Sequence, residues 1–114
     1  MTVREVAEQL ALEVLTGDEG LERQVQGGYA SDLLSDVIAH GEAGDVWVTL
    51  QTHRNVIAVA TLKELAAVVV VNGRTPDPDT LEAARKERVP VLRTALPAFE
   101  LAGRLHHMGI RGTR

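Results

Sequence analysis

Three short segments hold the side chains best suited to ligand chemistry, and the first is "GGYASD", residues 27–32. Paired glycines before a Ser-Asp helix start leave backbone N–H groups exposed, and such groups bind phosphate at a helix N-terminus. Gly28, Tyr29 and Ser31 are therefore candidate contacts for a nucleotide or another anion. The segment has neither the Gly-Lys-Ser/Thr of a Walker loop nor a GxGxxG fingerprint. We favour the simpler interpretation, in which the glycines allow close packing and Ser31 caps the helix.

The second segment is "QTHRN", in which Thr52, His53 and Arg54 stand at the start of a predicted helix. A cation at a helix N-terminus opposes the helix dipole, so Arg54 has no local stabilising role there. This arginine can bind an anionic ligand, pair with an acid across a dimer interface, or point into solvent. His53 can titrate near neutral pH, but no Asp or Ser at a useful spacing marks it as catalytic.

The third segment is "NGRTPDPD", which begins at Asn72 and follows a valine-rich stretch. The Asn-Gly pair favours a turn because both residue types tolerate positive φ. The prolines stiffen the loop before a helix that Asp77 or Asp79 can cap. A turn is the main interpretation, and ligand contact by Asn72, Gly73 or Arg74 is the alternative.

The remaining histidines do not form a recognisable metal site. His106 and His107 are adjacent, so on a helix they point about 100° apart and cannot easily bind one ion. His40 is distant in the sequence and lies near another helix end, where an imidazolium complements the dipole. The chain has no cysteine, and neither G-x-S-x-G nor H-E-x-x-H occurs. We therefore expect no metal, no cofactor and no enzymatic activity.

Composition argues against several classes of partner. The 114 residues carry a formal net charge of -4, form no Lys/Arg cluster, and include one Phe, one Trp and one Tyr. Nucleic-acid binding needs a basic surface or stacking platforms, so no nucleic-acid partner is expected. The amphipathic N-terminus does not resemble a signal peptide, and no stretch approaches the roughly 18 apolar residues of a membrane span. We expect a cytoplasmic protein without a membrane partner.

Helix and strand patterns alternate along the chain. Helices are predicted after capping residues Thr2, Ser31 or Asp32, Thr52, and Asp77 or Asp79, and a last one from Pro97 to Gly109. Strands are predicted in residues 11–17, in a segment ending near Gly27 and Gly28, and in residues 45–50, 66–73 and 89–94. The tail after Gly109 is expected to fray.

This alternation predicts a three-layer α/β sandwich, a mostly parallel sheet with helices on both faces. Four consecutive valines, Val68–Val71, indicate a strand buried on both faces. Ligands bind beyond the carboxyl ends of parallel strands, so we expect the three segments and a fourth, "RTALP" (residues 93–97), to share one rim there. We predict a single domain over residues 1–114 with a core of about 11–109.

In this order the segments make the chain similar to the DRTGG domain family over most of its length. That domain is the middle module of many bacterial phosphotransacetylases, and it also occurs in CBS-containing pyrophosphatases and as stand-alone proteins. The likeness rests on "GGYASDLLSDV", "GDVWVTLQTHRNVIAVA" and "AAVVVVNGRTPDPDTLEAARKERVPVLRTALPAFELAGRL". The last stretch is the most specific, because spacing and residue type agree throughout it.

The chain departs from the family at its signature residues. The Asp-Arg pair of the family falls on His53 and Arg54, so the arginine is kept and the acid is replaced. The family's Thr-Gly-Gly becomes Val71, Asn72 and Gly73, and any role that needs the aspartate is not carried over. The resemblance implies a Rossmann-like sandwich and a non-catalytic regulatory or ligand-binding module. In the pyrophosphatases the domain contributes to dimerisation.

Three functional hypotheses result. The first is a regulatory, ligand-sensing module that binds a nucleotide or acyl phosphate and acts as a homodimer or on an enzyme encoded elsewhere. The second is a structural dimerisation or docking domain without a small ligand, with an apolar patch on the helix that carries Val56, Val59 and Ala60. The third is a small phosphotransferase or hydrolase that uses His53 and Arg54.

Overall fold

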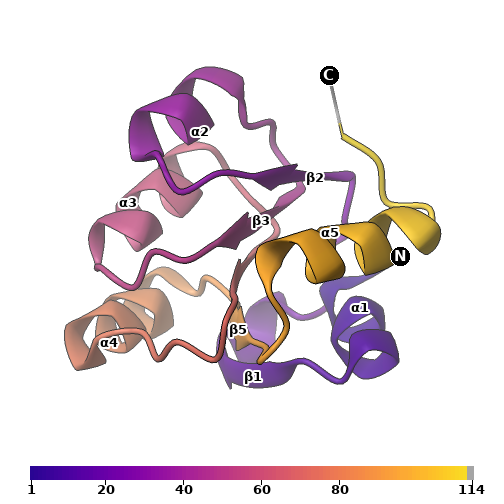
Figure 1. Ribbon diagram of the computed structural model, residues 1–114. Helices are drawn as coiled ribbons and strands as arrows, with labels where there is room; N and C mark the ends of the chain where they lie inside the picture. The colour runs from indigo at the N-terminus through magenta and orange to yellow at the C-terminus, as the bar shows by residue number, and fades with distance from the viewer. Residues whose placement is uncertain (113–114) are drawn as a thin grey trace.

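A single five-stranded sheet organises the chain in the computed structural model, which describes residues 1–112. The strands are β1 (Glu13–Thr16), β2 (Gly27–Ala30), β3 (Asp45–Thr49), β4 (Ala67–Val70) and β5 (Val91–Arg93). Their order is β1-β5-β4-β3-β2 (Figure 1). Strands β2 to β5 are mutually parallel, and β1 pairs antiparallel with β5. The predicted, mostly parallel sheet is confirmed.

Helices cover both faces of this sheet. They are α1 (Val3–Leu10), α2 (Leu34–His40), α3 (Asn55–Leu62), α4 (Pro78–Glu87) and α5 (Ala98–His107), with a short 3-10 turn, η1 (Asp18–Gly20). Helices α1 and α5 pack on one face, whereas α2, α3 and α4 pack on the other (Figure 1). The three-layer α/β sandwich is therefore confirmed.

The run of valines joins the two halves of the core. Val69 and Val71 belong to the cluster that includes Leu101 of α5. Val68 and Val70 belong to the opposite cluster with Ile57 of α3. Alternate side chains of a strand point to opposite faces, so a strand buried on both sides must be apolar throughout. Burial of each such side chain stabilises the fold by about 1.5–3 kcal/mol.

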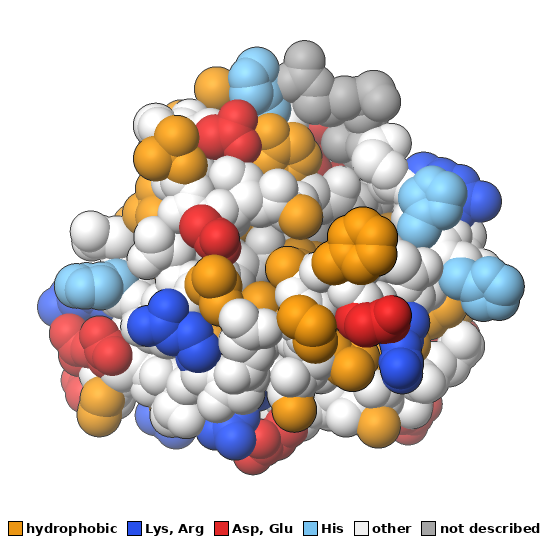
Figure 2. Space-filling view, viewed as in Figure 1, with side chains coloured by type: hydrophobic (Ala, Val, Ile, Leu, Met, Phe, Trp, Pro, Cys, Tyr) orange, Lys and Arg blue, Asp and Glu red, His pale blue; other side chains and the backbone are white. Residues whose placement is uncertain are grey.

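The apolar face of α3 is part of this core and not a free surface. The side chains of Val56, Val59 and Ala60 are all buried between α3 and the sheet. The sheet covers these three residues, so any docking patch on this helix must involve its exposed side, where Leu62 lies. On the face shown in Figure 2, hydrophobic side chains are visible over α5 and also over α2.

The second strand differs from the prediction in position. Gly27 and Gly28 begin β2 and do not end it, and the strand continues through Tyr29 to Ala30. Register with β3 explains the shift, because Tyr29 lies opposite Trp47 within the parallel ladder. A Cβ added at Gly28 would meet its nearest neighbours at ordinary contact distances of 3.6 and 3.7 Å. Close packing therefore does not require glycine at this position.

The tail after α5 is held in place as far as it is described. The Ile110 N–H donates to the Leu105 carbonyl at 3.1 Å, and the Gly28 N–H donates to the Arg111 carbonyl at 3.0 Å. Expected fraying of residues 110–112 is thus wrong, because the tail bonds to the edge of β2. Residues 113–114 lie outside the described part of the chain.

Candidate functional site

The carboxyl ends of β2 to β5 form one edge of the sheet, which we call the carboxyl rim (residues 31–33, 50–54, 71–75 and 94–96). Backbone hydrogen bonds join its loops. The Asn72 N–H donates to Leu96 O at 2.9 Å, and the Gly73 N–H donates to Thr94 O at 2.8 Å. The rim brings together seven of the nine predicted site residues: Ser31, Thr52, His53, Arg54, Asn72, Gly73 and Arg74.

Ser31 and Asp32 do not cap α2, contrary to expectation. The Ser31 hydroxyl accepts a hydrogen bond from the Leu33 N–H at 3.2 Å, and Leu33 occupies the N-cap without a side-chain cap. Asp32 Oδ1 accepts from the Thr49 hydroxyl at 3.0 Å and from the Leu50 N–H at 2.6 Å. The carboxylate bonds to β3 because that strand ends beside it and offers two donors.

The carbonyl groups of this segment are also occupied. The Trp47 indole N–H donates to Ser31 O at 2.8 Å, and the Gln51 amide donates to Asp32 O at 2.8 Å. These bonds join the segment after β2 to β3 and to the residues that follow β3. The backbone N–H groups of Gly28 and Ser31 also have partners, since they donate to Arg111 O at 3.0 Å and to Val48 O at 3.2 Å.

Thr52 connects the rim to α4 and does not cap α3. Its carbonyl accepts from the Asp77 N–H at 3.1 Å and from the Thr80 hydroxyl at 2.7 Å. Arg54 itself occupies the N-cap position of α3, again without a side-chain cap. Asp77 is the N-cap residue of α4, as predicted by position, but its side chain makes no cap hydrogen bond.

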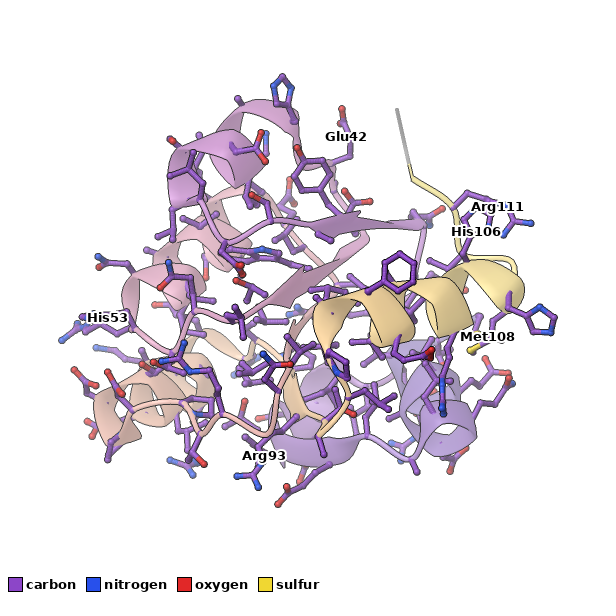
Figure 3. All side chains as sticks on the ribbon, in the orientation of Figure 1. Glu42, His53, Arg93, His106, Met108 and Arg111 are labelled. Carbon is purple, nitrogen blue, oxygen red and sulfur yellow. The ribbon has the colours of Figure 1, made fainter. Side chains whose placement is uncertain are left out.

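Two arginines of the rim keep their guanidinium groups available. Arg54 and Arg74 are exposed, and within residues 1–112 neither side chain makes a hydrogen bond or ion pair. His53 is likewise exposed, and in Figure 3 it points outward from the loop before α3. Arg93 differs, because it donates to the Thr75 hydroxyl at 2.8 Å and lies 3.4 Å from Glu13 Oε1.

The Asn-Gly turn is confirmed. Asn72 and Gly73 have φ values of 61° and 66°, both in the left-handed region that these residue types tolerate. Their backbone N–H groups already donate to Leu96 and Thr94. Ligand contact at this turn therefore falls to the exposed Asn72 side chain and to Arg74.

Gly28 and Tyr29 lie outside the rim, because β2 begins where it was expected to end. They line a hollow of about 140 Å³ together with Leu105, His106 and Ile110. The Tyr29 hydroxyl donates to Asp36 Oδ2 at 2.8 Å. These two predicted site residues are thus separated from the other seven.

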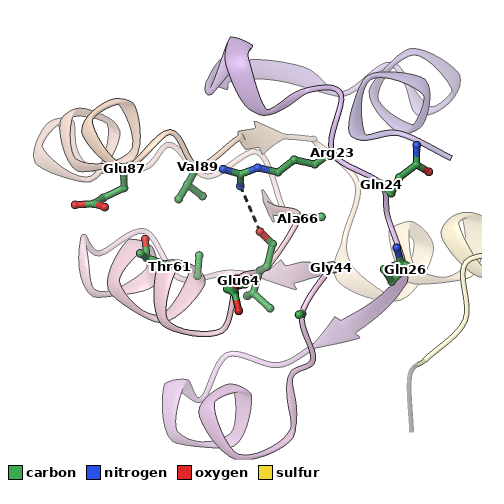
Figure 4. A pocket seen from close by; sticks show the side chains of 12 residues that line it. Arg23, Gln24, Gln26, Gly44, Thr61, Glu64, Ala66, Glu87 and Val89 are labelled. Atoms are coloured by element: carbon green, nitrogen blue, oxygen red, sulfur yellow. Dashed lines mark hydrogen bonds between the residues drawn. The ribbon is translucent and has the colours of Figure 1, made fainter.

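A larger groove of about 540 Å³ lies at the opposite, amino edge of the sheet, where no sequence motif predicts one (Figure 4). Arg23 crosses it, donating to Leu65 O at 3.5 Å and to Arg88 O at 2.9 Å. Leu65 and Arg88 lie just after α3 and α4, so Arg23 links the segments that leave these two helices. No local sequence signal connects Arg23 to partners so far along the chain.

The described part of the chain contains neither a metal-binding cluster nor a membrane-spanning helix. Within it, no group of three His, Cys, Asp or Glu side chains could hold a metal ion. No helix in residues 1–112 is long and apolar enough to cross a membrane.

Comparison with known proteins identifies the family. The model of the DRTGG domain matches residues 5–108. The chain belongs to the DRTGG domain family. No curated protein matches the chain.

A solved structure with a similar fold is the crystal structure of the CBS and DRTGG domains of the regulatory region of Clostridium perfringens pyrophosphatase, complexed with the activator diadenosine tetraphosphate. Its TM-score is 0.69 at 15% sequence identity, with 90% of this chain and 44% of that chain covered. The DRTGG domain described here thus spans less than half of that chain, and the likeness is one of fold.

Proposed function

We propose that this DRTGG domain is a non-catalytic regulatory module that binds an anionic small molecule, a nucleotide or an acyl phosphate, at the carboxyl rim. One observation carries the proposal. Arg54 and Arg74 follow the neighbouring strands β3 and β4, and both are exposed without a partner in residues 1–112. Guanidinium groups bind phosphate oxygens through two parallel hydrogen bonds, which makes this pair suited to a phosphate ligand.

Three further features support a ligand of this class. The first turn of α3 begins directly after Arg54, and the partial positive charge of a helix N-terminus attracts anions. The regulatory region of similar fold was solved with a dinucleotide activator. Loss of the family's aspartate at His53 removes a negative charge from the rim, which also favours an anion.

We further infer that the domain works as a homodimer and acts on an enzyme encoded elsewhere in the cytoplasm. Exposed apolar side chains support a protein partner. Leu62 at the end of α3 is 67% exposed, and Phe99 at the start of α5 is 90% exposed. Large apolar side chains that stay in water commonly mark protein contacts when they gather in a patch.

Calorimetric titration tests the ligand. Diadenosine tetraphosphate, ATP and acetyl phosphate are titrated into wild type and into Arg54→Met and Arg74→Met. We expect each substitution to weaken binding at least about tenfold, because a hydrogen bond to a charged group contributes about 1.5–3 kcal/mol. Arg85→Met, an exposed arginine in the last turn of α4, is the matched control and should bind as wild type. The proposal fails if none of the three compounds binds, or if both rim variants bind like the control.

The second candidate is a dimerisation or docking domain without a small ligand, which the exposure of Leu62 and Phe99 also favours. Sedimentation of the ligand-free protein separates the two. Stable self-association together with no titration heat would favour the second candidate. The phosphotransferase hypothesis lacks such support, since within residues 1–112 nothing hydrogen-bonds to the His53 side chain to orient it as a base.

A further inference from the structure

The outward face of α5 combines a protruding ring with a shallow groove. Phe99 is the only phenylalanine of the chain and is 90% exposed. Beside it lies a groove of about 330 Å³ between α5 and the end of α1, lined among others by Leu10, Gly103, His107 and Met108. We call this surface the α5 face. Figure 2 shows its hydrophobic side chains with acidic and basic side chains next to them.

Gly103 leaves an opening in this surface. A Cβ added at Gly103 would meet no atom within 4 Å. Gly103 stands one helical turn after Phe99, so the opening and the ring lie on the same side of α5. One molecule therefore presents both a protruding side chain and a depression able to receive one.

The charges of the α5 face are complementary to those of a second, antiparallel copy of the same face. Glu100 stands beside the ring near the amino end of α5, whereas Arg104 and His107 follow toward its carboxyl end. Glu100 and Arg104 are exposed, and neither makes an ion pair in the described residues. An antiparallel second copy of the helix would bring opposite charges together at both ends of the contact.

We propose that the α5 face binds the α5 face of a second copy of the chain about a two-fold axis. Each Phe99 then sits over Gly103 of the second copy, and each Glu100 lies beside Arg104 of the second copy. A two-fold interface uses the same patch twice and must be self-complementary in shape and charge. Buried aromatic anchors near the centre carry most of the energy of such contacts.

The inference deepens the proposed homodimer and rests on it, but it does not depend on the rim ligand. Neither Arg54 nor Arg74 takes part in the α5 face. The two proposals therefore make separate predictions, since ligand binding responds to the rim variants and self-association responds to the α5 variants.

Sedimentation velocity of the full chain over a concentration series tests the shape match. Phe99→Ala removes the ring, and Gly103→Leu fills the depression from a position whose added Cβ meets no neighbour within 4 Å. Each should weaken dimerisation at least about 30-fold, the loss expected for a hot spot of about 2 kcal/mol. Ile38→Ala, an exposed isoleucine on α2, is the control and should dimerise as wild type.

Charge reversal provides the second test. Glu100→Arg places two arginines opposite each other across the axis, and Arg104→Glu places two glutamates there. Each variant alone should lose its dimer, whereas an equimolar mixture should form a heterodimer, because every contact then joins opposite charges. Circular dichroism confirms that both variants stay folded, so a loss of dimer cannot be mistaken for unfolding.

The outcomes separate this inference from the proposed function. A wild-type protein that stays monomeric at tens of micromolar overturns both the homodimer and the α5 interface. A dimer that survives Phe99→Ala, Gly103→Leu and both charge reversals overturns the interface alone. Ligand titration of Arg54→Met is independent of either result.

Discussion

Arginine side chains at the amino edge of the sheet and at the carboxyl rim differ in their hydrogen bonding. At the amino edge, Arg23 donates to the carbonyl groups of Leu65 and Arg88 and so links the segments that follow α3 and α4. At the carboxyl rim, Arg54 and Arg74 have no such partners within residues 1–112. The groove of about 540 Å³ at the amino edge is therefore spanned by a structural arginine. Arg23 uses its guanidinium group within the fold, whereas the guanidinium groups of Arg54 and Arg74 remain available to a ligand.

The backbones of the two edges also differ in how closely they pack. Gly44 at the amino edge has φ +85°, and a Cβ there would lie 2.4 Å from Gln26 Cγ and 2.9 Å from Gln26 Cβ. Gly73 at the rim has φ +66°, but a Cβ added there would have its nearest neighbour, Ala95 Cα, at 3.9 Å. Gly44 is therefore tightly packed against Gln26, whereas Gly73 has free space around it.

The largest expected effect sharpens this contrast in packing. Gly44→Ala should lower the free energy of unfolding by about 2–4 kcal/mol, because left-handed strain adds to overpacking against Gln26. Gly73→Ala should lower it by only about 1–2 kcal/mol, the strain alone. Urea denaturation of both variants measures the difference, and equal losses would contradict it.

The next effect concerns the carboxylate that closes the rim. Asp32→Ala removes the acceptor of the Thr49 hydroxyl and the Leu50 N–H. We expect a loss of about 2 kcal/mol in unfolding free energy, within the range for hydrogen bonds to a charged group. Glu82→Ala, an exposed acid of α4, is the control and should change it by less than about 0.5 kcal/mol. A loss no larger than that of the control would show that Asp32 is dispensable for the fold.

A smaller effect compares the arginines of the two edges directly. Arg23→Met should lower the free energy of unfolding by about 1 kcal/mol, since two carbonyl groups lose a donor at a solvent-exposed site. Arg74→Met should leave it unchanged within about 0.5 kcal/mol, because no described hydrogen bond is lost. Chemical denaturation at constant pH measures both. If Arg74→Met proves the more destabilising, the assignment of structural and available arginines is reversed.

The smallest effect concerns α1, whose N-terminus adjoins the amino edge through the Val25 N–H bond to Met1 O. Hydrogen bonds from the backbone N–H and the side chain of Thr2 hold the pKa of Glu5 below its usual value. A lowered pKa stabilises the fold above the unfolded-state value, and this stabilisation is lost as pH falls through the folded-state value.

Glu5→Gln keeps the capping box but does not titrate. The difference in stability between wild type and this variant should be constant above about pH 5 and shift against wild type in more acidic buffer. Thermal unfolding across this pH range measures it. Parallel curves for the two proteins would contradict the predicted role of Glu5.

Features that depend on residues close together in the chain were predictable. The helix cap at Thr2, the Asn72-Gly73 turn and the burial of the valine run on both faces are all as expected. Each rests on spacing or on intrinsic φ preference, which the order of residues alone specifies. The alternation of these local patterns is also what made the α/β sandwich predictable.

The hydrogen-bond partners of polar side chains were not predictable. Asp32 could cap its own helix, yet it bonds to Thr49 and Leu50 of the neighbouring strand. Arg23 finds its carbonyl partners at Leu65 and Arg88, far along the chain. A polar side chain chooses among all donors and acceptors that folding brings near it, and most of these are distant in sequence.

The sequence thus determined the layers, the strand direction and the presence of Arg54 and Arg74 at one edge. Tertiary packing determined that the paired glycines begin β2, that Ser31 and Asp32 close a strand end, and that these two arginines stay available. The physical reason is that a strand's register is set by its neighbour, here by Trp47 opposite Tyr29. A shift of a few residues in that register decides which groups reach the rim.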